Sequence, residues 1–145
     1  MTAYADTGCI CSLHALDAHS ERIVAWLKRY RRPLPFTALH RLEFRNALRL
    51  RVFRKEITPQ QRELSIQAML SDLAANVFGH SEPEWHEVLL EAERLSAGHS
   101  ESLGTRSLDI LHVASALVLG VEQFVTFDTR QGSLASAAGL QWVTP

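Results

Sequence analysis

Four acidic residues that lie far apart in the sequence have the types and positions expected of a metal site. Asp6 and Asp128 each end a short apolar segment, while Glu43 and Asp109 fall in the first turns of expected helices. Two carboxylates about 5 Å apart repel by on the order of 3 kcal/mol at an effective dielectric constant near 20. A cluster of four acids therefore needs a cation, and ligands that are all oxygen favour Mg²⁺ or Mn²⁺ over Zn²⁺.

Each acid also has an ordinary interpretation when it is taken alone. Asp128 is suited to cap the helix that follows it, and Asp109 is a favourable charge at a helix N-terminus. Glu43 can pair with an arginine of its own helix. Four unrelated roles give no reason for the acids to gather at one place, whereas a shared ion does. Hard ions held by carboxylates typically act on phosphates, where they bind oxygens and lower the pKa of an attacking water.

The elements that must position these acids centre on residues 104–130. Apolar residues on nearly every side of residues 108–119 predict a buried helix, followed by a turn at Gly120 and a strand over residues 123–127. Further strands are expected at residues 3–6, 34–37, 77–78 and 140–143. Helices are expected at residues 21–31, 38–55, 59–75, 84–97 and 132–138, with Ser20, Thr37 and Thr58 as N-caps, and a polar loop at residues 98–105.

Strands that alternate with helices predict an α/β fold, a three-layer α/β/α arrangement with a central parallel sheet. The length of 145 residues suits one domain over residues 1–145. Right-handed crossovers bring the carboxyl ends of parallel strands to one edge, where ligands bind in open α/β sheets. All four acids are therefore expected at the same edge.

The expected helix at residues 38–55 carries two further features. Its apolar face is predicted to hold Leu39, Leu42, Leu50 and Phe53, with Glu43 on the same side.

Beside that face, Arg41, Arg45 and Arg49 form a stripe with i, i+4 spacing. Two interpretations of the stripe are open. The arginines contact RNA phosphates or acidic partner residues, or they form an ordinary solvated helix face. Asn46 lies about one turn from Glu43 and is expected to orient its carboxylate.

The net charge of −1 conceals a basic segment. Residues 22–62 hold 12 of the 15 Lys and Arg but only two of the 16 Asp and Glu, a local charge of +10. No apolar run is long enough to span a membrane, and the N-terminal residues lack a secretory pattern. Two closely spaced cysteines, Cys9 and Cys11, fit a reducing cytoplasm. His112 is expected to be a hydrogen-bonded core residue rather than a metal ligand.

The order of these motifs resembles the PIN domain over the whole chain. Asp6-Thr7, then Glu43, then Ser-Leu-Asp109-Ile-Leu-His-Val-Ala, then Thr126-Phe-Asp128-Thr-Arg-Gln is most similar to the VapC-type toxins of prokaryotic toxin–antitoxin pairs. The resemblance implies that the four acids bind the metal and that the Thr126 hydroxyl supports them. It implies Mg²⁺-dependent hydrolysis of an RNA phosphodiester, with a 5′-phosphate and a 3′-hydroxyl left behind.

The resemblance also implies a cognate antitoxin, and we expect the chain to form a homodimer. Leu13 and Leu16 lie near Trp26 and basic residues in the sequence, so they are candidates for an apolar groove with a basic rim that takes an acidic amphipathic helix.

Two other classes of protein were weighed. A PIN-like module that binds RNA or a partner without cutting is the alternative function, although the complete set of acids speaks against it. A haloacid dehalogenase-type phosphatase requires a second aspartate two residues after the first, and Gly8 stands there instead.

Overall fold

All 145 residues are described by the structure, a computed structural model. The chain forms two compact units: Met1–Asp6 with Glu82–Pro145, here called the terminal unit, and Thr7–Ser81, here called the inserted unit. Helices alternate with strands, and every strand pair is parallel. The predicted α/β class with parallel strands is therefore confirmed. The expectation of one domain over residues 1–145 stays a prediction.

The terminal unit is built on a three-stranded sheet. Its elements are β1 (Ala3–Ala5), α5 (Trp85–Leu95), the π-helical turn η1 (Ser96–Ser100), α6 (Glu101–Leu103), α7 (Ser107–Val118), β4 (Gln123–Val125), α8 (Thr129–Ala137) and β5 (Gln141–Val143). The central strand, β4, pairs with β1 on one side and β5 on the other. The pairing continues past the strands, because Asp6 N donates to Val125 O and Thr126 N donates to Val143 O. Asp6 and Thr126 therefore lie at the same edge of the sheet.

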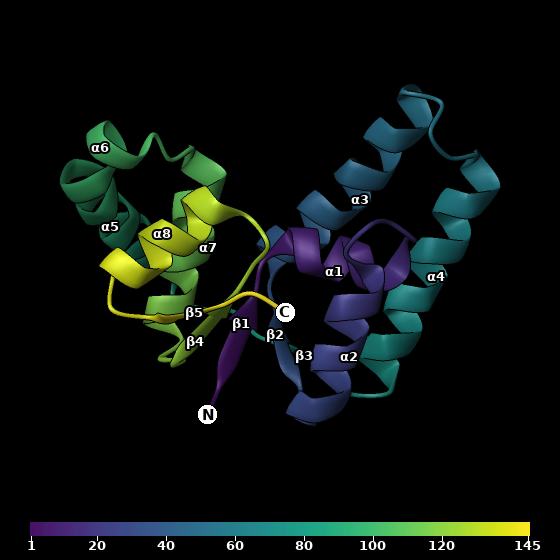
Figure 1. The fold of residues 1–145 in the computed structure, drawn as a ribbon, viewed down its shortest axis with the longest axis horizontal. Coiled ribbons are helices and arrows are strands. Elements are labelled where there is room, and N and C mark those ends of the chain that lie inside the picture. The colour runs from purple at the N-terminus through teal and green to yellow at the C-terminus, as the bar shows by residue number, and fades with distance from the viewer. The chain divides into compact units, whose positions relative to one another are not determined.

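Three helices, α5, α7 and α8, supply the rest of the core of the terminal unit (Figure 1). Tyr4 and Phe124 stack across neighbouring strands with ring centroids 5.7 Å apart. The buried residues packed with them are Val88, Leu95, Ile110, Val113, Ala114, Ala116, Leu134, Ala135 and Leu140. His112 belongs to this core, where its Nδ1 lies 2.7 Å from the Tyr4 hydroxyl, as the sequence predicted.

The prediction of a polar loop at residues 98–105 is wrong. Helical structure continues without a break from α5 through η1 and α6 to Leu103. Polar composition did not interrupt the helix because η1 and α6 lie at the surface, where their Ser, His and Glu side chains stay hydrated. The helix ends at Gly104, whose φ of 65° is the left-handed conformation that commonly terminates helices.

The inserted unit combines four helices with a two-stranded sheet. Its elements are α1 (Thr7–His14), α2 (Ser20–Tyr30), β2 (Leu34–Phe36), α3 (Ala38–Phe53), α4 (Pro59–Ala74) and β3 (Phe78–His80). The parallel pair β2–β3 places Leu34 opposite Phe78. The long helices α3 and α4 form a hairpin joined by residues 54–58 (Figure 1). No helix anywhere in the chain has both the length and the apolar character needed to cross a bilayer.

Helix starts in the inserted unit follow local sequence signals in two of three cases. Thr37 caps α3 and Thr58 caps α4, each in a capping box with the residue three positions on, His40 and Gln61 respectively. The predicted cap at Ser20 is wrong. Ser20 lies inside α2, and its hydroxyl donates to Ser12 O and accepts from the Asp17 amide.

The predicted inward face of α3 is correct at Leu39 and wrong at Leu42, Leu50 and Phe53. Phe44 and Leu48 are buried together with Leu39, whereas Leu42 is 67% exposed and Phe53 is 82% exposed. Two faces of α3 carry large apolar residues, so periodicity alone could not choose between them. Packing of α3 against α1 and α4 selects the face with Phe44 and Leu48.

The close approach of Trp142 to Gly132 yields a prediction about stability. A Cβ at Gly132 would lie 2.0 Å from Trp142 Cε2. We expect Gly132→Ala to lower the free energy of unfolding by about 1–3 kcal/mol, because the indole must move. Urea denaturation measures the change. The control is Gly98→Ala, where a Cβ meets nothing within 4 Å; equal stability of the two variants would contradict the packing argument.

Candidate functional site

A buried hydrogen bond between Thr126 and Asp6 forms the centre of the candidate site in the terminal unit. Asp6 follows β1 and is 8% exposed, and Thr126 follows β4 and is fully buried. The Thr126 hydroxyl donates to Asp6 Oδ2 over 2.6 Å. Hydrogen bonds to an ionised acceptor are among the stronger ones in proteins. The predicted supporting role of Thr126 therefore has a direct contact behind it.

The same hydroxyl helps to shape the start of α8. Its oxygen accepts a hydrogen bond from the Asp128 amide over 2.9 Å. Asp128 is the N-cap of α8, and its Oδ1 accepts from the Gln131 amide over 2.9 Å. The ordinary interpretation of Asp128 as a helix cap is thus correct for one of its two carboxylate oxygens.

Gln131 connects Thr126 with Asp109. It is 2% exposed; its Oε1 lies 3.3 Å from Thr126 Oγ1 and its Nε2 lies 3.5 Å from Asp109 Oδ1. No role for Gln131 was predicted from the sequence. Its signal was present as the Asp128-x-x-Gln131 spacing, which is typical of a capping box.

Asp109 lies in the first turn of α7, as predicted. Its other oxygen, Oδ2, is 3.2 Å from Nε of Arg106, whose side chain is largely exposed. An ion pair of this kind at the surface contributes little stability. Arg106 therefore neutralises part of the charge of Asp109.

Trp142 supports the site from the side of α8. Its indole covers Gly132, and its Nε1 donates to the Thr126 carbonyl over 3.2 Å. Because Thr126 N also donates to Val143 O, β5 holds both the amide and the carbonyl of Thr126.

The fourth acid, Glu43, belongs to the inserted unit. It lies in the second turn of α3 and not in the predicted first turn, because the helix begins at Ala38 after the cap at Thr37. It is half-buried and accepts a hydrogen bond from the Thr7 hydroxyl over 2.9 Å. Thr7 opens α1 and directly follows Asp6 in the chain. Asn46, which was expected to orient Glu43, is exposed and lines a hollow on α3 together with Arg41, Arg45 and Arg49.

The chemistry of these residues fits a hard divalent cation. The acids offer carboxylate oxygens only, and the buried Thr126 hydroxyl fixes the orientation of Asp6 before any ion binds. No group of three or more His, Cys, Asp and Glu side chains is arranged in the structure so that it could hold a metal. The terminal unit brings Asp6, Asp109 and Asp128 into one network through Thr126 and Gln131.

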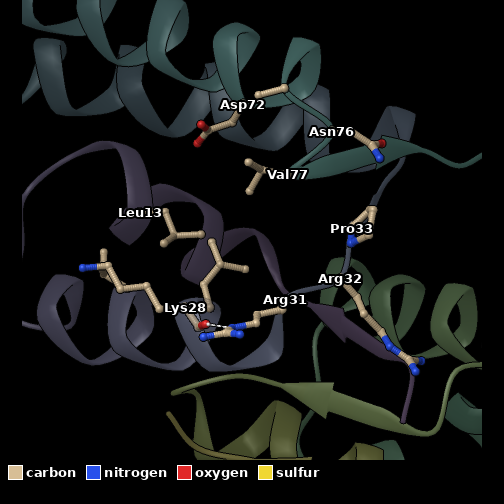
Figure 2. Close-up of a pocket in the computed structure, with 11 residues that line it drawn as sticks. Leu13, Lys28, Arg31, Arg32, Pro33, Asp72, Asn76 and Val77 are labelled. Carbon is tan, nitrogen blue, oxygen red and sulfur yellow. Dashed lines mark hydrogen bonds between the residues drawn. The ribbon is translucent and has the colours of Figure 1, made fainter.

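A larger groove lies elsewhere in the inserted unit (Figure 2). It has a volume of about 640 Å³. Apolar side chains come from α1, α2 and the residue before β3, and basic side chains come from the end of α2 and the two residues after it. The lining residues are Leu13, Val24, Leu27, Lys28, Arg31, Arg32, Pro33, Asp72, Ala75, Asn76 and Val77. In Figure 2, Leu13 and Val77 point toward the same space. Leu16, which was expected beside Leu13, lines a different hollow with Leu64.

Comparison with known proteins places this fold in a family. The chain is similar to a solved structure described as FitAcB from Neisseria gonorrhoeae, with 19% sequence identity over 97% of this chain and 96% of that chain and a TM-score of 0.64. At this identity the similarity shows the fold alone. No curated protein matches the sequence. A family model described as the PIN domain matches residues 3–137, so the chain belongs to the PIN domain family.

Proposed function

We propose that this protein is a metal-dependent endoribonuclease that hydrolyses RNA phosphodiester bonds and acts as the toxin of a toxin–antitoxin pair. PIN domains are typically metal-dependent nucleases. The single observation that carries the proposal is the network in which Thr126 and Gln131 link three acids of the terminal unit. Helix capping alone explains Asp128, but it does not explain why a buried hydroxyl and a buried amide also bind Asp6 and Asp109.

The proposed ligands of Mg²⁺ or Mn²⁺ are Asp6, Asp109, Asp128 and Glu43. When bound, such an ion supplies Lewis acidity toward phosphate oxygens and lowers the pKa of water. Within the chain, Thr126 holds the Asp6 carboxylate in one orientation, and Thr7 does the same for Glu43.

Gln131 and Arg106 each occupy one oxygen of Asp109. In the proposed hydrolysis the attacking group is water, so no side chain of this set needs to act as a nucleophile and no covalent enzyme intermediate is required.

The distribution of charge supports RNA as the substrate. Residues 22–62 carry a local charge of +10 in a chain with a net charge of −1. Most of these cations belong to α2 and α3, including Arg41, Arg45 and Arg49. A basic face of this kind attracts the phosphate backbone irrespective of sequence.

The groove in Figure 2 supports the proposed partner, an antitoxin that presents an acidic amphipathic helix. Apolar residues such as Leu13 and Leu27 offer contacts for one helix face, and Lys28 and Arg32 offer charges for acidic residues beside it. The resemblance to VapC-type toxins also implies an antitoxin as the partner. We also propose that the protein acts as a homodimer.

The first prediction from this proposal concerns the metal and the acids. RNA cleavage should stop in EDTA and return with Mg²⁺ or Mn²⁺ but not with Zn²⁺, and Asp109→Asn should abolish it with the fold retained. The measurement is cleavage of total RNA, with sequencing of the new ends. Glu101→Gln, which removes an exposed acid from the same unit, is the matched control. Specific RNA binding without metal-dependent cleavage would instead favour a non-catalytic binding module.

The second prediction distinguishes the effect of the Thr126 hydroxyl group from the effect of the side-chain volume. Thr126→Val should lower the free energy of unfolding by about 1–3 kcal/mol, because Asp6 Oδ2 and the Asp128 amide lose a partner inside the protein. It should also reduce cleavage more than binding of RNA. Thr126→Ser keeps the hydroxyl and should retain most of both properties. A valine variant as active as the serine variant would rule out the supporting role.

The third prediction concerns the groove. Lys28→Glu with Arg32→Glu should weaken binding of the protein encoded by the adjacent gene, because acidic residues of that partner would face new negative charges. Calorimetry on the co-expressed pair measures the effect. Arg22→Glu, at an exposed position of α2 outside the groove, is the control for overall charge. Equal affinity of the double variant and the wild type would place the partner on another surface.

A further inference from the structure

The arginine stripe of α3 borders a hollow that the proposed catalytic residues do not use. The hollow has a volume of about 330 Å³, and its lining is Ala38, Arg41, Leu42, Arg45, Asn46 and Arg49. Three of these six side chains are guanidinium groups. Every lining residue belongs to α3, so the hollow lies within the inserted unit.

Arg45 differs from its two neighbours in the stripe. Its Nη1 is buried and has no hydrogen-bond partner. A buried donor without an acceptor costs about 1–3 kcal/mol, and more when it is charged. The same guanidinium group lines the hollow, so Arg45 is the member of the stripe whose capacity to donate hydrogen bonds is least used within the protein.

The charges around Arg45 also favour the binding of an anion. Burial lowers the pKa of Arg45 from its usual value, and the positive charges of Arg41 and Arg49 lower it further. Glu63 of α4 acts in the opposite direction. One carboxylate thus acts on Arg45 against two neighbouring arginines, so the surroundings of Arg45 keep an excess of positive charge that a bound anion would offset.

The spacing of the stripe suits a chain of phosphates. Residues four apart on a helix are separated by about 6 Å along the axis, so Arg41, Arg45 and Arg49 offer three cations in a row. A guanidinium binds two phosphate oxygens side by side, which a single point charge does not.

An acidic helix from a protein partner would also meet this row, but it would need an apolar surface beside it. The lining contains one exposed large apolar side chain, Leu42. The groove in Figure 2, by contrast, includes Leu13, Val24 and Leu27.

We propose that the hollow on α3 binds a backbone phosphate of single-stranded RNA, with Arg45 as its main ligand and Arg41 and Arg49 on the adjoining phosphates. The proposal rests on the proposed ribonuclease function and adds to it a binding site for the substrate on α3. It also gives Asn46 a new role, because its exposed amide at the same hollow is available to the nucleotide. The earlier expectation tied Asn46 to Glu43.

The test compares variants of equal charge change in the full chain. The probe is a 2′-O-methyl single-stranded oligonucleotide, which is not cleaved, with EDTA present throughout. Arg45→Gln should weaken binding several-fold and lower the slope of log affinity against log salt by about 0.7, as expected for one lost contact on a single strand. Arg29→Gln, at an exposed position of α2 outside the hollow, should change both values less.

A second variant should act in the opposite direction. Glu63→Gln removes the carboxylate that competes for Arg45 and should tighten binding of the same oligonucleotide. Circular dichroism and thermal melting check the fold of each variant. Arg45→Gln is expected to fold, since it removes a cation with an unpaired buried nitrogen and two like-charged neighbours.

Two results would overturn the phosphate site. One is equal affinity and equal salt slope for Arg45→Gln and Arg29→Gln. The other is loss of binding to an acidic helical peptide by Arg45→Gln while its oligonucleotide binding stays intact, which would assign the hollow to a protein partner.

Failure of the ribonuclease itself has a separate signature. The wild-type protein would then leave RNA uncut in Mg²⁺ or Mn²⁺, even if Arg45→Gln weakened oligonucleotide binding. If both proposals hold, Arg45→Gln should raise KM for RNA and leave kcat close to its wild-type value.

Discussion

The hydrogen bond from Thr126 to Asp6 joins the ends of two neighbouring parallel strands in a place with little access to water. A buried carboxylate is costly unless its oxygens are bound. The strand register meets this need directly, because Ala5 lies opposite Val125 and the next residue on each strand is Asp6 or Thr126. Any shift between the strands would separate hydroxyl from carboxylate and leave both unsatisfied. The register of the strand pair therefore also fixes the geometry of the candidate site.

In the turn from β4 to α8, a structural role is combined with the proposed metal-binding role. A carboxylate has two oxygens, so Asp128 can cap α8 with Oδ1 and still offer Oδ2 to a ligand. Gln131 continues the first turn of α8 and also contacts Asp109. Trp142 covers Gly132 and binds the Thr126 carbonyl, which ties this turn to β5. Helix capping and metal binding are thus compatible uses of one carboxylate rather than competing interpretations.

Features set by nearby residues could be predicted from the sequence, whereas features set by packing could not. The caps at Thr37 and Thr58 depend on three or four adjacent residues, and the common edge of Asp6 and Thr126 follows from the rule for parallel strands. The inward face of α3 depends on which neighbours cover Phe44 rather than Leu42, and a one-dimensional pattern does not contain them. Gln131 was missed because burial of a long polar side chain depends on groups brought together only by the fold.

The division of the terminal unit into two distant chain segments has a consequence for synthesis. Asp6 and Thr126 are 120 residues apart, and the whole inserted unit lies between β1 and the remainder of the sheet. On a ribosome, residues 7–81 emerge and can fold while β1 still has no strand to pair with. Closure of so long a loop is a late and slow step in folding. The acids of the terminal unit consequently meet only after nearly all of the chain has been translated, so an unfinished chain lacks the site.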